Sequence, residues 1–201
     1  MTTTAASFHL ARLHLASRRV PASLLTLAAA AAALRIMLQW TPASGAYSVM
    51  FPLTVATAAA SVVSVTTRSP LGEPERATGR WLPWLRLGTV LALAGAACGA
   101  LALGAVGGHL ALGSLALLRD LAGLTGTGLL AAVVLGAGLS WIGPLAYLVV
   151  SVYAVQEAWT TPWLWAARPA PDRGAAICAA LVFAAGVAVI SLRGAVGSSR
   201  D

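Results

Sequence analysis

The sequence predicts an all-α integral membrane protein: a six-helix bundle with both termini in the cytoplasm and an amphipathic N-terminal segment at the membrane interface. Hydrophobic residues make up 59% of the chain and charged residues 9%, whereas a soluble domain carries about 25% charge. Six apolar runs follow one another, and arginines gather on alternate connections. These three observations together predict the fold class and its topology.

The composition also bears on source and partners. All 13 Lys or Arg positions are arginine, and alanine and glycine are abundant, a bias typical of a GC-rich genome such as that of an actinobacterium. We attribute the net charge of +7 to positive charge beside membrane spans rather than to nucleic-acid binding. Cys98 and Cys178 lie in apolar runs without a CxxC motif, so we expect them to be small buried side chains.

Each apolar run is predicted to be a helix, because backbone groups cannot stay unpaired in lipid and about 20 helical residues cross its apolar core. The fourth and fifth runs are continuous, and "GAGLSWIGP" divides them into a tight helical hairpin. The first, fifth and sixth runs are short for a crossing. The predicted spans are residues 24–40, 47–67, 87–106, 121–139, 141–156 and 175–192 of one transmembrane domain covering residues 1–201.

Arginine placement predicts the orientation. With the N-terminus inside, nine arginines fall on cytoplasmic segments and three on outer segments, Arg119, Arg168 and Arg173. This bias places both termini and residues 68–86 in the cytoplasm. The nine are Arg12, Arg18, Arg19, Arg68, Arg76, Arg80, Arg86, Arg193 and Arg200.

Residues 1–20 precede the first span and mix apolar and basic side chains, as in "SFHLARLHLASRRV". As a helix, this segment would lie at the inner interface beside anionic lipid. The alternative is a twin-arginine export signal at "SRR", although Arg35 interrupts the apolar run that follows. His9 and His14 are five apart and therefore do not share a helix face as two metal ligands would.

Small residues recur every four positions in three spans, a pattern that lets helices approach closely. We interpret the pattern as packing within the bundle, with a dimerisation face as the alternative. The residues are Ala176, Ala180, Ala184 and Ala188; Gly128, Ala132 and Gly136; and Gly95 and Gly99.

The sequence lacks the patterns of catalytic and cofactor sites. It contains no HExxH pair, no paired-carboxylate run, no Gly-x-Ser-x-Gly turn and no phosphate loop. We therefore predict that the chain is not an enzyme, has no catalytic residue and holds no metal or cofactor. If it moves a substrate actively, a partner must supply the energy.

Three charges are candidates for a cargo path or an intramembrane pair: Arg35, Asp120 and Glu157. Arg35 either extends to the outer interface, or it has a functional role in which it faces a substrate path or pairs with Asp120. Asp120 follows Arg119 just before the fourth predicted span, where an acid at a helix start is favoured by the helix dipole. Glu157 ends the fifth span. A membrane enzyme would need these three residues to converge.

The outer segment of residues 157–171 is rich in tryptophan. Trp159, Trp163 and Trp165 are expected to form an aromatic belt at the interface. Two prolines nearby favour a segment that dips partly into the membrane, and a plain exposed loop is the alternative.

The most charged segment, "RSPLGEPERATGRWLPWLRLG", links the second and third spans and holds six charges within residues 68–86. One interpretation is a solvated loop that only sets the topology. The other is an amphipathic turn bounded by Trp81 and Trp84 that docks on a partner, with charges fixing partner and register. Pro83 limits any helix here to residues 75–82.

An interfacial segment, a charged loop after the second span, a tryptophan-rich segment before the sixth, and inside termini form an arrangement that resembles the membrane subunit of ABC-2 type transporters. That family carries a coupling helix between spans two and three, with an acidic pattern ending in Gly-Thr. Here "GEPERATGRW" departs from it, because Thr78 precedes Gly79 and Pro74 interrupts the acids. The resemblance implies ATPase-coupling residues Glu73, Glu75, Arg76, Arg80, Trp81 and Trp84.

The expected function is therefore the membrane-spanning subunit of an exporter in the bacterial inner (plasma) membrane. The resemblance implies an ABC ATPase subunit and a second six-helix permease subunit, a copy of this chain or a homologue, as partners. Few charges inside the spans favour a hydrophobic or amphipathic cargo. The alternatives are an assembly partner, an immunity factor or a sensor that works without an ATPase, and a substrate-binding importer subunit, which would need a polar pocket in its outer half.

Overall fold

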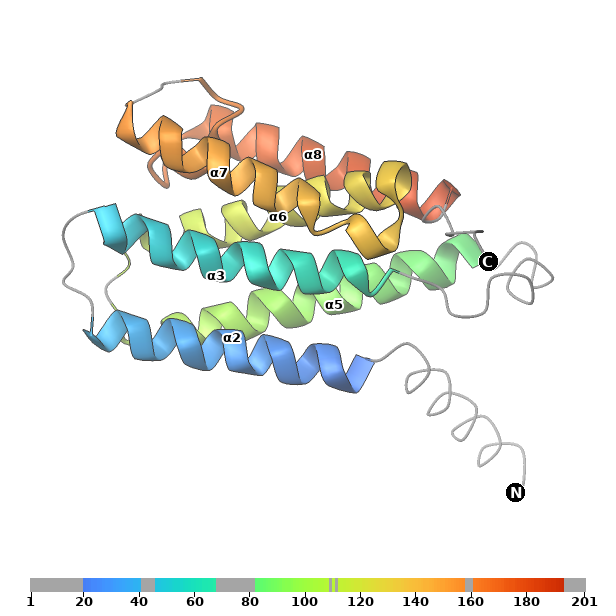
Figure 1. Ribbon diagram of the computed structural model, residues 1–201, viewed down its shortest axis with the longest axis horizontal. Coiled ribbons are helices and arrows are strands. Elements are labelled where there is room, and N and C mark those ends of the chain that lie inside the picture. Colours follow the sequence, from blue (N-terminus) through green and yellow to red (C-terminus); the bar gives the residue numbers. More distant parts are fainter. Residues whose placement is uncertain are drawn as a thin grey trace.

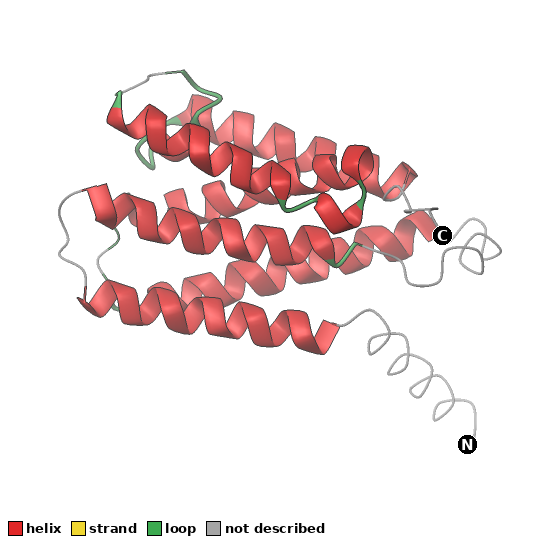
Figure 2. Cartoon of the chain, in the orientation of Figure 1, coloured by secondary structure: helices red, strands yellow, loops and turns green. Residues whose placement is uncertain are grey.

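The computed structural model describes residues 20–40, 46–67, 82–108, 110, 112–157 and 161–193. Within these ranges the chain is helical and has no strand, and six of its helical stretches are long and apolar enough to cross a membrane (Figure 1, Figure 2). The predicted all-α, multi-pass class is confirmed. The helices are α2 (Val20–Trp40), α3 (Ala46–Val65), α5 (Leu82–Ala105), α6 (Gly113–Leu135), α7 (Ile142–Gln156) and α8 (Arg173–Arg193), with short 3-10 helices η2 (Ala137–Leu139) and η3 (Trp165–Ala167).

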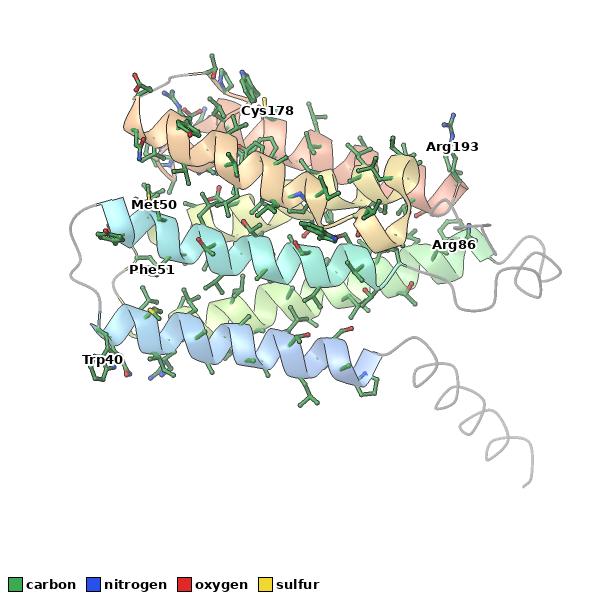
Figure 3. All side chains as sticks on the ribbon, in the orientation of Figure 1. Trp40, Met50, Phe51, Arg86, Cys178 and Arg193 are labelled. Atoms are coloured by element: carbon green, nitrogen blue, oxygen red, sulfur yellow. The ribbon has the colours of Figure 1, made fainter. Side chains whose placement is uncertain are left out.

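The helices run back and forth between two ends of the bundle. Helices α2, α5 and α7 end, and α3, α6 and α8 begin, at the left end of Figure 1, whereas α2 begins and α8 finishes at the right end. Figure 3 places Arg86 and Arg193 at the right end and Trp40 at the left end. The alternation agrees with the predicted topology, so we call the left end the predicted outer end and the right end the predicted cytoplasmic end.

Helix α6 lies at the centre of the bundle, because α3, α5, α7 and α8 all contact it. Glycines allow α8 to approach most closely: a Cβ on Gly126 would lie 2.6 Å from the backbone nitrogen of Phe183, and one on Gly186 would lie 2.7 Å from the carbonyl oxygen of Gly126. Large apolar side chains also cover the outside, among them Leu25, Leu103 and Leu181. An apolar exterior is what a lipid environment requires.

The small-residue pattern packs within the bundle only in part. Gly128 and Ala132 of α6 are buried, as predicted. The stripe of Ala176, Ala180, Ala184 and Ala188 is instead exposed, because α8 turns a different face toward α6. A Cβ on Gly95 or Gly99 of α5 would meet nothing within 4 Å. Bundle packing is thus the wrong interpretation for the stripes of α5 and α8. The residues that α8 buries are Ala175, Ala179, Gly186, Val187, Ile190 and Ser191.

Several helices extend beyond the ends predicted for their spans. α2 and α8 each have 21 residues, so the first and sixth spans are not short. α5 begins at Leu82, since a proline such as Pro83 is tolerated in the first turn of a helix. The hairpin after α6 is confirmed: Gly136 has φ 87°, and the stretch Ala137–Gln156, which joins η2 to α7, provides a 20-residue crossing.

The largest shift concerns the fourth span, which was predicted to begin at residue 121. α6 begins at Gly113, so Arg119 and Asp120 lie inside the helix rather than before it. A charged pair breaks an apolar run in the sequence, but it does not end a helix when other parts of the fold supply hydrogen-bond partners.

Candidate functional site

The segment between α7 and α8 folds back into the bundle at the predicted outer end (Figure 1). We call residues 161–172 the tryptophan segment. Its Leu164, Trp165 and Ala166 are buried, and η3 contacts α6, α7 and α8. Residues 164–166 therefore pack into the bundle, so the segment is not a plain exposed loop. Trp163 is exposed as an interface anchor should be, but Trp165 is only 3% exposed, so its assignment to the aromatic belt is wrong. Trp159 lies outside the described residues.

The indole of Trp165 occupies a slot between two helices. On one side it stacks on Tyr147 of α7, with ring centroids 4.3 Å apart and planes 14° apart. On the other it lies against Gly123 of α6, where a Cβ would come within 2.6 Å of the indole Nε1 and would overlap the ring carbons beside it. Only glycine leaves room for the ring at this position, because interiors are close-packed.

Arg119 holds the main chain of the tryptophan segment. Its Nη1 donates to the carbonyl oxygen of Pro169 at 3.0 Å, and its Nη2 donates to that of Arg168 at 2.8 Å. Its Nε donates to Asp120 Oδ1 at 3.1 Å, and both side chains of this ion pair are buried. A buried pair is tolerable only when its remaining groups are also hydrogen-bonded. Asp120 supplies the countercharge, and the segment supplies the two carbonyl acceptors.

A second ion pair anchors the segment at the start of α8. Arg168 Nε donates to Asp172 Oδ2 at 2.6 Å, and the backbone N–H of Ala175 donates to Asp172 Oδ1 at 3.1 Å. The N–H of Ala175, and then the guanidinium of Arg168, lower the pKa of Asp172 below its usual range. Asp172 therefore caps α8 as a carboxylate and fixes the end of the segment.

The hydroxyl of Tyr147 links α7 to the segment. It donates to the carbonyl oxygen of Trp163 at 3.2 Å and accepts the N–H of Ala166 at 3.4 Å. Two buried side-chain polar atoms in the described part of the chain make no hydrogen bond of ordinary length and angle, Ser151 Oγ and Trp165 Nε1, although Ser151 also interacts with the hydroxyl of Tyr147. Both belong to neighbours of Tyr147, since Ser151 is one turn further along α7 and Trp165 stacks on its ring. Unpaired buried polar atoms are rare in folded proteins and call for an explanation.

Among the described residues, no ion pair joins Arg35, Asp120 and Glu157, the three charges predicted to line a cargo path or form an intramembrane pair. Arg35 is exposed, and its Nη1 donates to the carbonyl oxygen of Val106 at 2.7 Å, just past the end of α5. That position suits a cation, because helix C-termini carry partial negative charge. Among the described residues Asp120 pairs with Arg119 and not with Arg35. Asp120 is also not a first-turn acid, because α6 has none, and Glu157 is exposed just after α7.

Asp120 also lines a small pocket at the predicted outer end between α3 and α6. Ser48, Pro52, Leu53, Ala116 and Leu117 contribute to its walls. Its volume of about 20 Å³ gives room for about one water molecule. The pocket can therefore hydrate the carboxylate of Asp120, but it is too small for a cargo.

The predicted coupling residues lie mostly outside the described residues: Glu73, Glu75, Arg76, Arg80 and Trp81. Trp84 is described, and it is exposed in the first turn of α5 at the predicted cytoplasmic end, opposite the tryptophan segment. Cys98 and Cys178 are free and half-buried against the apolar core, close to what was predicted. Residues 1–19 and His109 are likewise outside the described ranges.

Comparisons with protein-family models, curated proteins and solved structures find no match to this chain.

Sequence reasoning missed Gly123, Tyr147 and Ser151, because an isolated glycine, tyrosine or serine in an apolar run carries no periodic signal. Asp172 could have been found, since an acid three residues before Ala175 at the start of an apolar run is typical of a helix cap.

Proposed function

We propose that this chain is the membrane-spanning subunit of an ABC-type exporter of the ABC-2 class, in the inner membrane of a bacterium such as an actinobacterium. The observation that carries the proposal is the tryptophan segment, which folds back into the outer end of a six-helix bundle just before the last helix. The resemblance implies a re-entrant segment at this place in the chain. It also implies a charged coupling loop at the opposite end, where residues 68–86 lead into α5.

The environment of the charges favours a hydrophobic or amphipathic cargo. Arg35, Arg119 and Asp120, the charges inside the spans, already have hydrogen-bond partners within the protein. A strongly charged cargo would have to displace these bonds. The apolar surfaces of the helices suit a cargo that enters from lipid.

Energy would come from a separate ATPase that docks on residues 68–86. The charges there would fix the partner and its register. The loop connects α3 to α5, so a movement of the loop caused by the ATPase would be transmitted directly to both helices. Both α3 and α5 also contact the central α6. Trp84, exposed at the start of α5, supplies an aromatic contact at the same end.

A second six-helix subunit completes the proposed transporter. The exposed alanine stripe of α8, Ala176 to Ala188, supports a close helix contact with it, because small side chains let helix backbones approach in a membrane.

Co-purification tests the proposal. The protein is extracted in mild detergent from its native host, and bound proteins are identified by mass spectrometry. We expect an ABC ATPase with the wild type and at least a tenfold loss with Glu75→Ala/Arg76→Ala. The matched control is Glu157→Ala/Arg173→Ala, which removes one acid and one base exposed at the other end and should retain the ATPase.

If no ATPase co-purifies with the wild type, the transporter proposal fails. The charged loop is then a topology signal, and an assembly partner, an immunity factor or a sensor becomes the better explanation of the fold.

A further inference from the structure

The tryptophan segment covers a group of polar side chains inside an otherwise apolar bundle. These are the guanidinium of Arg119 and the hydroxyls of Tyr147 and Ser151, contributed by α6 and α7. Two nitrogens of Arg119, Nη1 and Nη2, and the hydroxyl of Tyr147 donate to main-chain carbonyls of the segment, whereas Ser151 Oγ makes no hydrogen bond of ordinary geometry in the described structure. Without the segment, these groups would line a hydrogen-bonding site against the ring of Tyr147.

The segment fills this site in the way that a ligand would. It presents two neighbouring carbonyl oxygens, those of Arg168 and Pro169, to the planar fork of Arg119. It also presents a flat indole, that of Trp165, to the ring of Tyr147. The segment is held by main-chain contacts, by the buried side chains of Leu164, Trp165 and Ala166, and at its end by the ion pair of Arg168 with Asp172. None of these contacts is a backbone hydrogen bond of α6 or α7, so both helices stay wound when the segment withdraws.

The fit of the segment is incomplete. Trp165 Nε1 and Ser151 Oγ are both buried and make no hydrogen bond of ordinary geometry in the part of the chain that the structure describes. Leaving a buried donor such as Trp165 Nε1 unpaired opposes this closed arrangement, and withdrawal of the segment frees the indole to find a partner. The Ser151 hydroxyl is also a spare donor or acceptor for a ligand that carries one more polar group than the segment does.

The ion pair between Arg119 and Asp120 determines which class of ligand the site can bind. Asp120 already neutralises Arg119, so a second anion at the fork would face the carboxylate of Asp120. A neutral carbonyl of an amide or ester, like the main-chain carbonyls now bound, avoids this repulsion. The flat slot between Gly123 and Tyr147 suits a planar aromatic group.

We propose that Arg119, Tyr147 and Ser151 form a binding site for an amphipathic molecule that carries amide or ester carbonyls and a planar aromatic group, and that the tryptophan segment occupies this site as an internal ligand. That the molecule is the exported cargo rests on the proposed function. The site and its occupation by the segment do not.

The test uses the full chain in lipid nanodiscs without any ATPase, so it is independent of co-purification. Ala166→Cys in a Cys98→Ala/Cys178→Ala background reports withdrawal of the segment, because Ala166 is buried in it. A polar maleimide should label this cysteine slowly. N-acetyl-tryptophan octyl ester, which has an indole, two carbonyls and an apolar tail, should increase the labelling rate at least fivefold and saturably. N-acetyl-leucine octyl ester is the matched probe without the planar ring and should have a much smaller effect.

Binding of the tritiated tryptophan ester tests the residues of the site. Trp165→Ala vacates the slot and should tighten binding at least tenfold, whereas Trp163→Ala, at an exposed tryptophan of the same segment, should not. Adding Tyr147→Ala/Ser151→Ala to Trp165→Ala should remove the gain. Gly123→Ala provides a second way to displace the ring while keeping α6 helical, with Gly95→Ala as its control.

Three outcomes overturn the proposal. The first is labelling that does not respond to the tryptophan ester. The second is a response that is equal for the two esters or does not saturate, which indicates a general effect on the membrane. The third is a gain in Trp165→Ala that survives loss of Tyr147 and Ser151, which indicates only an engineered cavity. None of these outcomes bears on ATPase binding, and loss of the ATPase does not bear on them.

Discussion

Two arginines of the membrane spans, Arg119 and Arg35, have opposite surroundings. Arg119 is buried in α6 and donates three hydrogen bonds, to Asp120 and to two carbonyls of the tryptophan segment. Arg35 is exposed on α2 and donates one, to the carbonyl of Val106. The same residue type is thus a buried link between distant segments in one place and a surface contact at a helix end in the other. An arginine in an apolar run has structural importance when several of its donors reach acceptors on other elements.

The same contrast separates two parts of the bundle. Around α6, a glycine such as Gly123 admits a neighbouring side chain, and the interior is filled to contact distance. On α5, Gly95 faces open space, and a methyl group there would meet nothing within 4 Å. A glycine-to-alanine substitution in each part therefore tests whether the region around α6 tolerates added volume less than α5 does.

The largest effect is expected for Arg119→Leu. Removing one partner of a buried pair leaves the carboxylate of Asp120 uncompensated and two segment carbonyls unpaired, which costs about 3–5 kcal/mol of folding free energy. Equilibrium unfolding of the purified protein in detergent measures this cost.

The double variant Arg119→Leu/Asp120→Leu is the control for this prediction. It removes both charges, so it should recover a large part of the loss. If the single and double variants are equally destabilised, the pair is not the source of the effect, and the comparison with Arg35 loses its basis.

Gly123→Ala is expected to have the next largest effect. The added methyl group collides with the indole of Trp165, and overpacking of this kind costs about 1–3 kcal/mol. Gly95→Ala is the matched control, which should be neutral or stabilise by up to about 1 kcal/mol because alanine favours helix. Thermal unfolding of the two variants side by side measures the difference, and equal effects would mean that Trp165 does not fill the slot.

The sequence was sufficient to predict the six membrane-length helices of the described residues and the hairpin, because apolar runs and the break at Gly136 are local signals. It was not sufficient to place Arg119, since a charge usually ends an apolar run and only the carbonyls of Arg168 and Pro169, about 50 residues away, make its burial possible. Charge counting therefore assigned the residue to an outer loop.

Burial within the candidate site was equally hard to predict. Trp163 and Trp165 look alike in sequence, and only Trp165 meets the ring of Tyr147 and the bare backbone of Gly123. The predicted packing of the α8 alanine stripe inside the bundle was wrong for another reason. In so alanine-rich a helix two adjacent faces carry small residues, so Ala175 and Ala179 are buried while Ala176 and Ala180 are exposed.

A small effect is expected for Arg35→Gln. The side chain is exposed, and a cation near a helix C-terminus contributes about 0.3–1 kcal/mol. The amide of glutamine can also donate to the carbonyl of Val106. Unfolding measured beside Arg119→Leu checks the ranking, and a loss as large as that of Arg119→Leu would contradict the distinction between the two arginines.

The smallest effect is expected for Asp172→Ala, and this effect should depend on pH. The N–H of Ala175 and the guanidinium of Arg168 lower the pKa of Asp172 in the folded protein, whereas in the unfolded chain an aspartate titrates near about 3.9. The stability that the carboxylate contributes is therefore fully present above that unfolded value, and it is lost as the pH falls through the lower folded pKa.

The wild type should have a higher melting temperature than Asp172→Ala at neutral pH, and this difference should narrow as the pH falls below about 4. A gap for Asp172→Ala that is constant with pH would mean that the side chain acts through packing, and the cap of α8 would then not depend on its charge.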